Sequence, residues 1–98
     1  MYKAIILPLA KQDVCEAALW YNKKSQGLDK RFTAEVREKV RLISQNPTAF
    51  NVRYDDVHTA ALNVFPYMVH YTIDEVNKTV IVSAVLHTSR DPELWENR

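Results

Sequence analysis

The sequence predicts one α+β domain over residues 1–98, with the element order β-α-α-β-β-β-β and a helical hairpin packed on a small, mostly antiparallel sheet. Three observations lead to this prediction. Two segments of the first half repeat apolar residues at helical spacing, with one glycine between them. From Phe50 onward, short runs rich in valine, tyrosine, phenylalanine and threonine favour strands. A chain of 98 residues with 47% apolar content supports one hydrophobic core.

The first elements are a strand and a helix. The stretch YKAIILP is apolar and β-branched, so we expect an edge strand that Pro8 ends. In the following segment, AKQDVCEAALWYNKKSQG, we expect Asp13 as the N-cap of a helix, because Glu16 follows three residues later as in a capping box. Gly27 is expected to stop this helix. Its apolar face comprises Val14, Ala17, Ala18 and Tyr21.

The second helix has the clearer pattern, over LDKRFTAEVREKVRLISQNP. Apolar residues repeat at i, i+4, i+8 and i+11, and they are Phe32, Val36, Val40 and Ile43. The Asn46-Pro47 pair is expected to end the helix. The short link through Gly27 makes the two helices antiparallel neighbours.

The remaining chain predicts four strands, in FNVRY, HTAALNVF, YMVHYTID and TVIVSAVLH. The third of these runs alternates, with Tyr67, Val69, Tyr71 and Ile73 on one side and Met68, His70 and Thr72 on the other. The last run is apolar on both faces, which indicates a central strand covered on both sides.

Charge is unevenly distributed. The net charge is +1, but residues 11–46 carry +3 and residues 47–98 carry −3. Since nucleic-acid affinity depends largely on the neutralisation of phosphates, the C-terminal half is poorly equipped to bind RNA or DNA.

Several classes of site are excluded by what the sequence lacks. A single glycine cannot form a glycine-rich phosphate loop, and His58, His70 and His87 lack metal-ligand spacing, so we expect neither cofactor nor metal. No apolar run approaches the length of a membrane span. Cys15 is the only cysteine, so no internal disulfide can form; we expect it as a small core residue, in a protein of the reducing cytoplasm.

The ordered motifs of the chain resemble those of a known family. They stand in EAALWYNKKSQGLDKRFTAEVREKVRLISQNPTAF, in FPYMVHY and in VIVSAVLHTSRDPELWENR. The marks are Trp20-Tyr21, Gly27-Leu28, Phe32, Asn46-Pro47, Phe65-Pro66-Tyr67, Tyr71, His87, Arg90, Pro92 and Trp95. Over nearly its whole length the chain resembles the RelE/ParE superfamily of bacterial toxins, many of which are known as plasmid stabilisation proteins.

The resemblance implies the toxin of a type II toxin–antitoxin pair. Such a toxin is a cytoplasmic protein held inactive by the flexible segment of a cognate antitoxin, and the complex represses its own operon. The resemblance is compatible both with a homodimer and with a toxin–antitoxin hetero-oligomer. RelE-like members cut mRNA on the translating ribosome, whereas ParE-like members inhibit DNA gyrase by binding and are not hydrolases.

Which activity this chain has depends on its sheet residues. A metal-independent endoribonuclease needs a base, an acid and cations around one phosphate. The resemblance offers His87, Arg90, His58 and Arg53 as candidates, with His70 as a further one. Asn63 and Val64, however, stand where relatives often carry basic residues. We therefore expect a ParE-like inhibitor of a target such as gyrase, with the RelE-like ribonuclease as the alternative and His87 as a structural residue.

Residues for partner binding are expected on the hairpin and at the C-terminus; they are Trp20, Lys23, Lys24, Arg31 and Trp95. The basic residues of the two helices form an outer face that could bind an acidic partner or could simply be solvated. They are Lys23, Lys24, Lys30, Arg31, Lys39 and Arg41. A third alternative is an inactive homologue that still binds its antitoxin.

Overall fold

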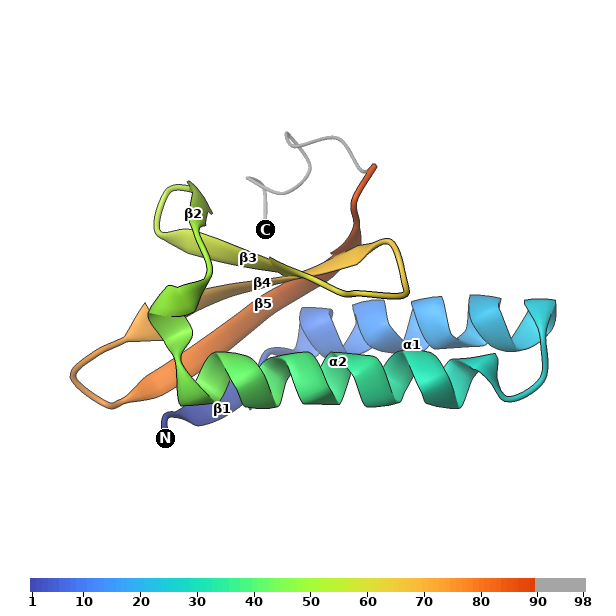
Figure 1. The fold of residues 1–98 in the computed structure, drawn as a ribbon, viewed down its shortest axis with the longest axis horizontal. Helices are drawn as coiled ribbons and strands as arrows, with labels where there is room; N and C mark the ends of the chain where they lie inside the picture. The colour runs from blue at the N-terminus through green and yellow to red at the C-terminus, as the bar shows by residue number, and fades with distance from the viewer. Residues whose placement is uncertain (90–98) are drawn as a thin grey trace.

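The structure, a computed structural model, describes residues 1–89. A five-stranded sheet forms one layer, and two antiparallel helices cover one of its faces (Figure 1). The elements are β1 (Lys3–Ile6), α1 (Pro8–Lys24), α2 (Leu28–Gln45), the short 3-10 helix η1 (Pro47–Ala49), β2 (Val52–Tyr54), β3 (Val57–Ala61), β4 (Tyr67–Asp74) and β5 (Thr79–His87). The predicted fold class and element order are confirmed.

Helix α1 begins at Pro8, so the prediction of Asp13 as its N-cap was wrong. Proline suits the first helical position, because its missing N–H would have no partner there and its ring fixes φ near the helical value. Asp13 consequently lies inside the helix, where its carboxylate can reach another element. Cys15 is exposed on α1, and the expectation that it is a core residue was also wrong.

Helix α2 follows a tight turn in which Gly27 has φ 89°, a left-handed conformation that glycine adopts without strain. Its apolar stripe is buried as predicted, at Phe32, Val36, Val40 and Ile43. The stripe packs on the sheet together with Ala17 and Tyr21 of α1. The helix ends where expected, with the N–H of Asn46 donating to the carbonyl of Leu42.

The strand order is β1-β5-β4-β3-β2, with β1 parallel to β5 and all other pairs antiparallel. Strand β1 pairs only with Thr79–Val82. Opposite β4 the register shifts, since His70 pairs with Ala84 while Tyr71 pairs with Val82, and this leaves Ser83 as a bulge. Strand β5 therefore continues past the end of β1, and within residues 1–89 no strand lies beside its outer edge from Ser83 to His87.

The two faces of β4 differ as predicted. Tyr67, Val69 and Tyr71 belong to the core under the helices, whereas Met68 packs with Ala84 on the opposite face. No helix of residues 1–89 covers this second face, which we call the helix-free face. Four aromatic rings join the hairpin to the start of β4, with centroid separations of 4.8–6.2 Å. They belong to Tyr21, Phe32, Phe65 and Tyr67. This cluster fixes α1 beside the C-terminal half of β5.

Among the described residues, no helix combines the length and the apolar character that crossing a membrane requires.

Candidate functional site

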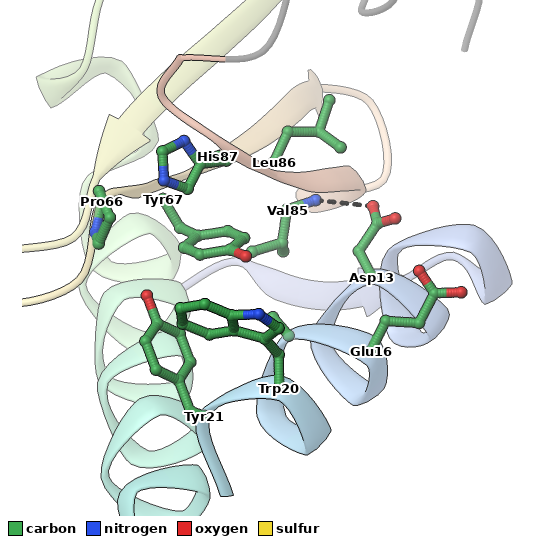
Figure 2. A pocket seen from close by; sticks show the side chains of 10 residues that line it. Asp13, Glu16, Trp20, Tyr21, Pro66, Tyr67, Val85, Leu86 and His87 are labelled. Carbon is green, nitrogen blue, oxygen red and sulfur yellow. Dashed lines mark hydrogen bonds between the residues drawn. The ribbon is translucent and has the colours of Figure 1, made fainter. Parts of the chain in front are cut away.

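A cleft of about 440 Å³ lies between α1 and the C-terminal half of β5 (Figure 2). Its walls come from α1, from the start of β4 and from the end of β5. The lining residues are Asp13, Glu16, Ala17, Trp20, Tyr21, Pro66, Tyr67, Val85, Leu86 and His87. We call this hollow the α1–β5 cleft.

One wall of the cleft is the open edge of β5. The last backbone bond from the β1 side joins the N–H of Leu7 to the carbonyl of Val82, at 3.0 Å. Farther along, the N–H of Val85 donates to Oδ2 of Asp13 at 3.0 Å, as the dashed line in Figure 2 shows. Because alternate residues of a strand point the same way, the backbone N–H and C=O of His87 also face this edge. The Asp13 side chain thus occupies part of the β5 edge, at a place where another strand would fit.

The floor of the cleft is aromatic. Trp20 is 52% exposed, and its ring meets the edge of Tyr21 at a centroid distance of 5.0 Å. Tyr21 is buried, in agreement with its place on the predicted apolar face of the first helix. Burial raises the pKa of Tyr21, and the neighbouring Tyr67 adds to this shift. A half-exposed indole beside an open strand edge is a surface suited to binding a protein segment.

His87 lines the cleft at its β5 end. Its Nδ1 accepts a hydrogen bond from the N–H of Ser89 at 3.1 Å and lies 2.7 Å from Oγ of the same residue. Nδ1 is therefore the unprotonated nitrogen in this arrangement. The imidazole also meets the ring of Tyr67 at 5.2 Å, nearly edge-on. Through these contacts the imidazole joins the end of β5 to Ser89 and to the ring of Tyr67.

The other proposed catalytic residues lie elsewhere. His58 has its Nδ1 2.6 Å from the carbonyl oxygen of Phe50 and stacks on Tyr71 at 5.1 Å, under the helices. Arg53 donates to the sulfur of Met68 at 3.6 Å, on the helix-free face. Arg90 lies outside the described residues. The structure therefore separates His87, His58 and Arg53.

A second hollow, of about 450 Å³, lies where η1 and β2 meet β3 and β4. Its lining residues are Ala49, Phe50, Asn51, Val52, Arg53, Thr59, Ala61 and Met68. Arg53 supplies the single positive charge among them. Within residues 1–89, no group of three or more His, Cys, Asp or Glu side chains is placed to hold a metal ion.

The predicted basic face is smaller than expected. Lys39 is 8% exposed, with its ammonium 5.6 Å from the centre of the Phe50 ring. Arg41 is paired with Glu38, whose pKa this hydrogen bond lowers. The exposed cations that remain lie around the turn between the helices, at Lys23, Lys24, Lys30 and Arg31. Of the predicted partner-binding residues, Trp20 lies in the cleft, and Trp95 lies outside the described residues.

Sequence reasoning assigned no role to Asp13 in the cleft, although the pattern held a signal. Asp13, Ala17 and Tyr21 recur at i, i+4 and i+8, which places the carboxylate on the same helical face as two buried residues. An acidic residue on a core-facing stripe indicates a specific partner for its oxygens.

Comparisons with known proteins agree with the fold. Residues 4–92 match the sequence profile of the ParE toxin of the type II toxin–antitoxin system parDE. Among solved structures, the chain is similar to the chromosomal ParDE toxin–antitoxin system of P. aeruginosa, with a TM-score of 0.79, 15% identity and coverage of 91% of this chain and 98% of that one. No curated protein sequence matches the chain.

Toxin–antitoxin complexes of the RelBE type contain the same fold, with lower TM-scores. The RelBE2 complex of Mycobacterium tuberculosis gives a TM-score of 0.64 at 21% identity, covering 88% of this chain and 96% of that one. The intact E. coli RelBE complex gives 0.62 at 16% identity, covering 92% of this chain and 100% of that one.

Proposed function

This chain belongs to the ParE toxin family of type II toxin–antitoxin systems, and from that premise we propose that it arrests bacterial growth by binding DNA gyrase in the cytoplasm. In this proposal it inhibits gyrase through its protein surface and does not cut RNA. A cognate antitoxin neutralises it by occupying the α1–β5 cleft.

The observation that carries the proposal is the separation of the candidate acid, base and cation. A ribonuclease must place all three around one phosphate, within hydrogen-bond reach of its oxygens. His87 and His58 pair with Tyr67 and Tyr71, four residues apart on β4, which corresponds to about 13 Å along a strand. Arg53 lies on the other face of the sheet. One phosphate cannot contact these three side chains, and this supports an inhibitor that needs no such centre.

The placement of the antitoxin rests on the shape and chemistry of the cleft. The edge of β5 offers the backbone N–H and C=O of His87 to an extended segment. Beside that edge, Trp20 offers an apolar surface of which half is exposed. Both features suit a segment that pairs with β5 and places an apolar side chain against the indole. The solved structures with this fold that are toxin–antitoxin complexes support an antitoxin as the partner.

The proposal is tested by producing the protein alone in a bacterial host, following growth and mapping new 5′ ends of mRNA. We expect growth arrest without new cuts in translated messages, and relief of the arrest when the antitoxin is co-produced. Cuts at codon-spaced positions would establish the RelE-like alternative. Normal growth, together with antitoxin binding, would establish the inactive homologue.

A further inference from the structure

The turn between the two helices projects beyond the sheet, at the end of the molecule opposite the N-terminus (Figure 1). We call residues 22–31, with the sequence NKKSQGLDKR, the hairpin tip. The tip contains four basic side chains and one carboxylate, a net charge of +3, while the whole chain has a net charge of only +1. The positive charge of this protein is thus concentrated on one protrusion.

The basic residues of the tip are exposed, and in the part of the chain that the structure describes they form no ion pair. Lys23, Lys30 and Arg31 are exposed, and within residues 1–89 none of them forms an ion pair. The ammonium of Lys24 lies 5.0 Å from the centre of the Trp20 ring, where it still faces solvent. Lys23 and Lys24 come from the last turn of α1, and Lys30 and Arg31 from the first turns of α2.

Stabilisation of the helix ends explains only two of the four positive charges of the tip. Lys23 and Lys24 stand at the C-terminus of α1, where cations interact favourably with the helix dipole. Lys30 and Arg31 stand at the N-terminus of α2, where cations are unfavourable. Gly27, the N-cap of α2, provides no side chain there, and Asp29 supplies one carboxylate in the first turn against these two cations. Two cations kept at an unfavourable place indicate an anionic partner.

The remaining tip residues indicate which anionic partner this is. None of the large exposed hydrophobic side chains of the described residues lies within the tip. A protein interface usually has an aromatic or apolar anchor at its centre, and the tip lacks one. Asn22, Ser25 and Gln26 add side chains of the types that, with lysine and arginine, contact phosphate oxygens.

We propose that the hairpin tip binds the phosphate backbone of duplex DNA. This inference rests on the proposed function, since gyrase acts on duplex DNA and a toxin bound to it would lie close to that DNA. The tip would contact about three phosphates without reading base sequence.

The first test is fluorescence anisotropy of a labelled 30-base-pair duplex with the full chain at several KCl concentrations. With three phosphates neutralised, the binding constant should fall about 40-fold between 50 and 200 mM salt, from a slope of about −0.9 per phosphate. The test variant is Lys23→Gln/Lys30→Gln/Arg31→Gln. Its matched control is Lys3→Gln/Lys11→Gln/Arg37→Gln, which removes the same charge from exposed positions outside the tip.

We expect the tip variant to lose at least 10-fold in DNA affinity at 50 mM salt and most of the salt slope, while the control changes less than threefold. The tip variant should also melt at the same or a slightly higher temperature, because Lys30 and Arg31 oppose the dipole of α2. Equal loss in the two variants, or no loss in either, would overturn the proposal.

A gyrase assay separates this inference from the proposed function. If the native chain inhibits supercoiling, the tip variant should need at least 10-fold more protein for the same inhibition. A tip variant that loses inhibition but keeps its DNA affinity would show that the tip meets an acidic protein surface, and would overturn the inference. If the native chain does not inhibit gyrase, the proposed function fails, and the anisotropy result still decides whether the tip binds DNA.

Discussion

The carboxylate of Asp13 accepts a hydrogen bond from the backbone N–H of Val85, 72 residues away along the chain. This contact joins the middle of α1 to β5 at a point that β1 does not reach. It stabilises an unpaired strand edge from within the molecule, and it leaves the neighbouring backbone groups of His87 available to a partner.

Replacement of Asp13 should therefore cost stability. In Asp13→Ala the N–H of Val85 loses its acceptor in a partly buried place, and the free energy of unfolding should fall by about 1–3 kcal/mol in urea denaturation. Asp13→Asn keeps an acceptor oxygen and should lose less than half as much. The control is Gln12→Ala, an exposed neighbour that bonds only to Glu16 and should change stability by less than ~0.5 kcal/mol. Full stability of Asp13→Ala would contradict the role given to this bond.

Because of Tyr71, we expect the stability of the folded protein to decrease at alkaline pH. Its buried hydroxyl donates to the carbonyl of Pro47, and burial raises its pKa to about 12, from about 10 in an unfolded chain. Between these values the folded protein keeps a proton that the unfolded chain loses, so the stabilisation is complete below pH about 10 and disappears as the pH rises through about 12.

The comparison with Tyr71→Phe isolates this group. At pH 7 the variant should lose about 1 kcal/mol of unfolding free energy with the hydroxyl. Above pH about 10, the difference between the native chain and the variant should shrink, as measured by urea denaturation at matched pH. A difference that stays constant from pH 9 to 12 would count against the proposed ionisation of Tyr71.

Trp20→Ala should weaken antitoxin binding much more than it destabilises the fold. Half of the side chain is already exposed, so we expect a loss of less than about 1 kcal/mol in stability. Affinity for the co-purified antitoxin, measured by calorimetry, should fall at least about 10-fold if the indole is a central contact. The matched control is Leu19→Ala, since Leu19 is also exposed but does not line the cleft. Equal effects of the two substitutions would remove the cleft as the antitoxin site.

His87→Ala should leave growth arrest intact. The imidazole bonds to Ser89 and packs on Tyr67, and the proposed inhibition of gyrase assigns it no chemical step. The measurement is the growth of cells that produce the variant, with its folding checked by circular dichroism. Loss of arrest in a folded variant that still binds antitoxin would return His87 to a catalytic role.

Much of the fold follows from local patterns, and these were predictable. The four apolar positions of α2 and the alternation of Tyr67, Val69 and Tyr71 on β4 depend only on periodicity, and the structure confirms them. The start of α1 was missed because a capping-box pattern at Asp13 was preferred over the proline at the first helical position.

The cleft depends on contacts that no local pattern contains. Strand β1 pairs in parallel with Thr79–Val82, and this pairing joins the first strand of the chain to the last one. The free edge of β5 beyond Ser83 is a consequence of this pairing. The burial of Lys39 depends on Phe50 folding back over α2. Such features come from tertiary packing, so the sequence indicated Trp20 and His87 as candidates without placing them in one hollow.

The most direct measurement is the supercoiling of relaxed plasmid by purified DNA gyrase with increasing amounts of this protein. We expect dose-dependent inhibition by the native chain and by His87→Ala, and recovery of supercoiling when the antitoxin is added. Full supercoiling at protein concentrations that arrest growth in cells would rule out gyrase as the target.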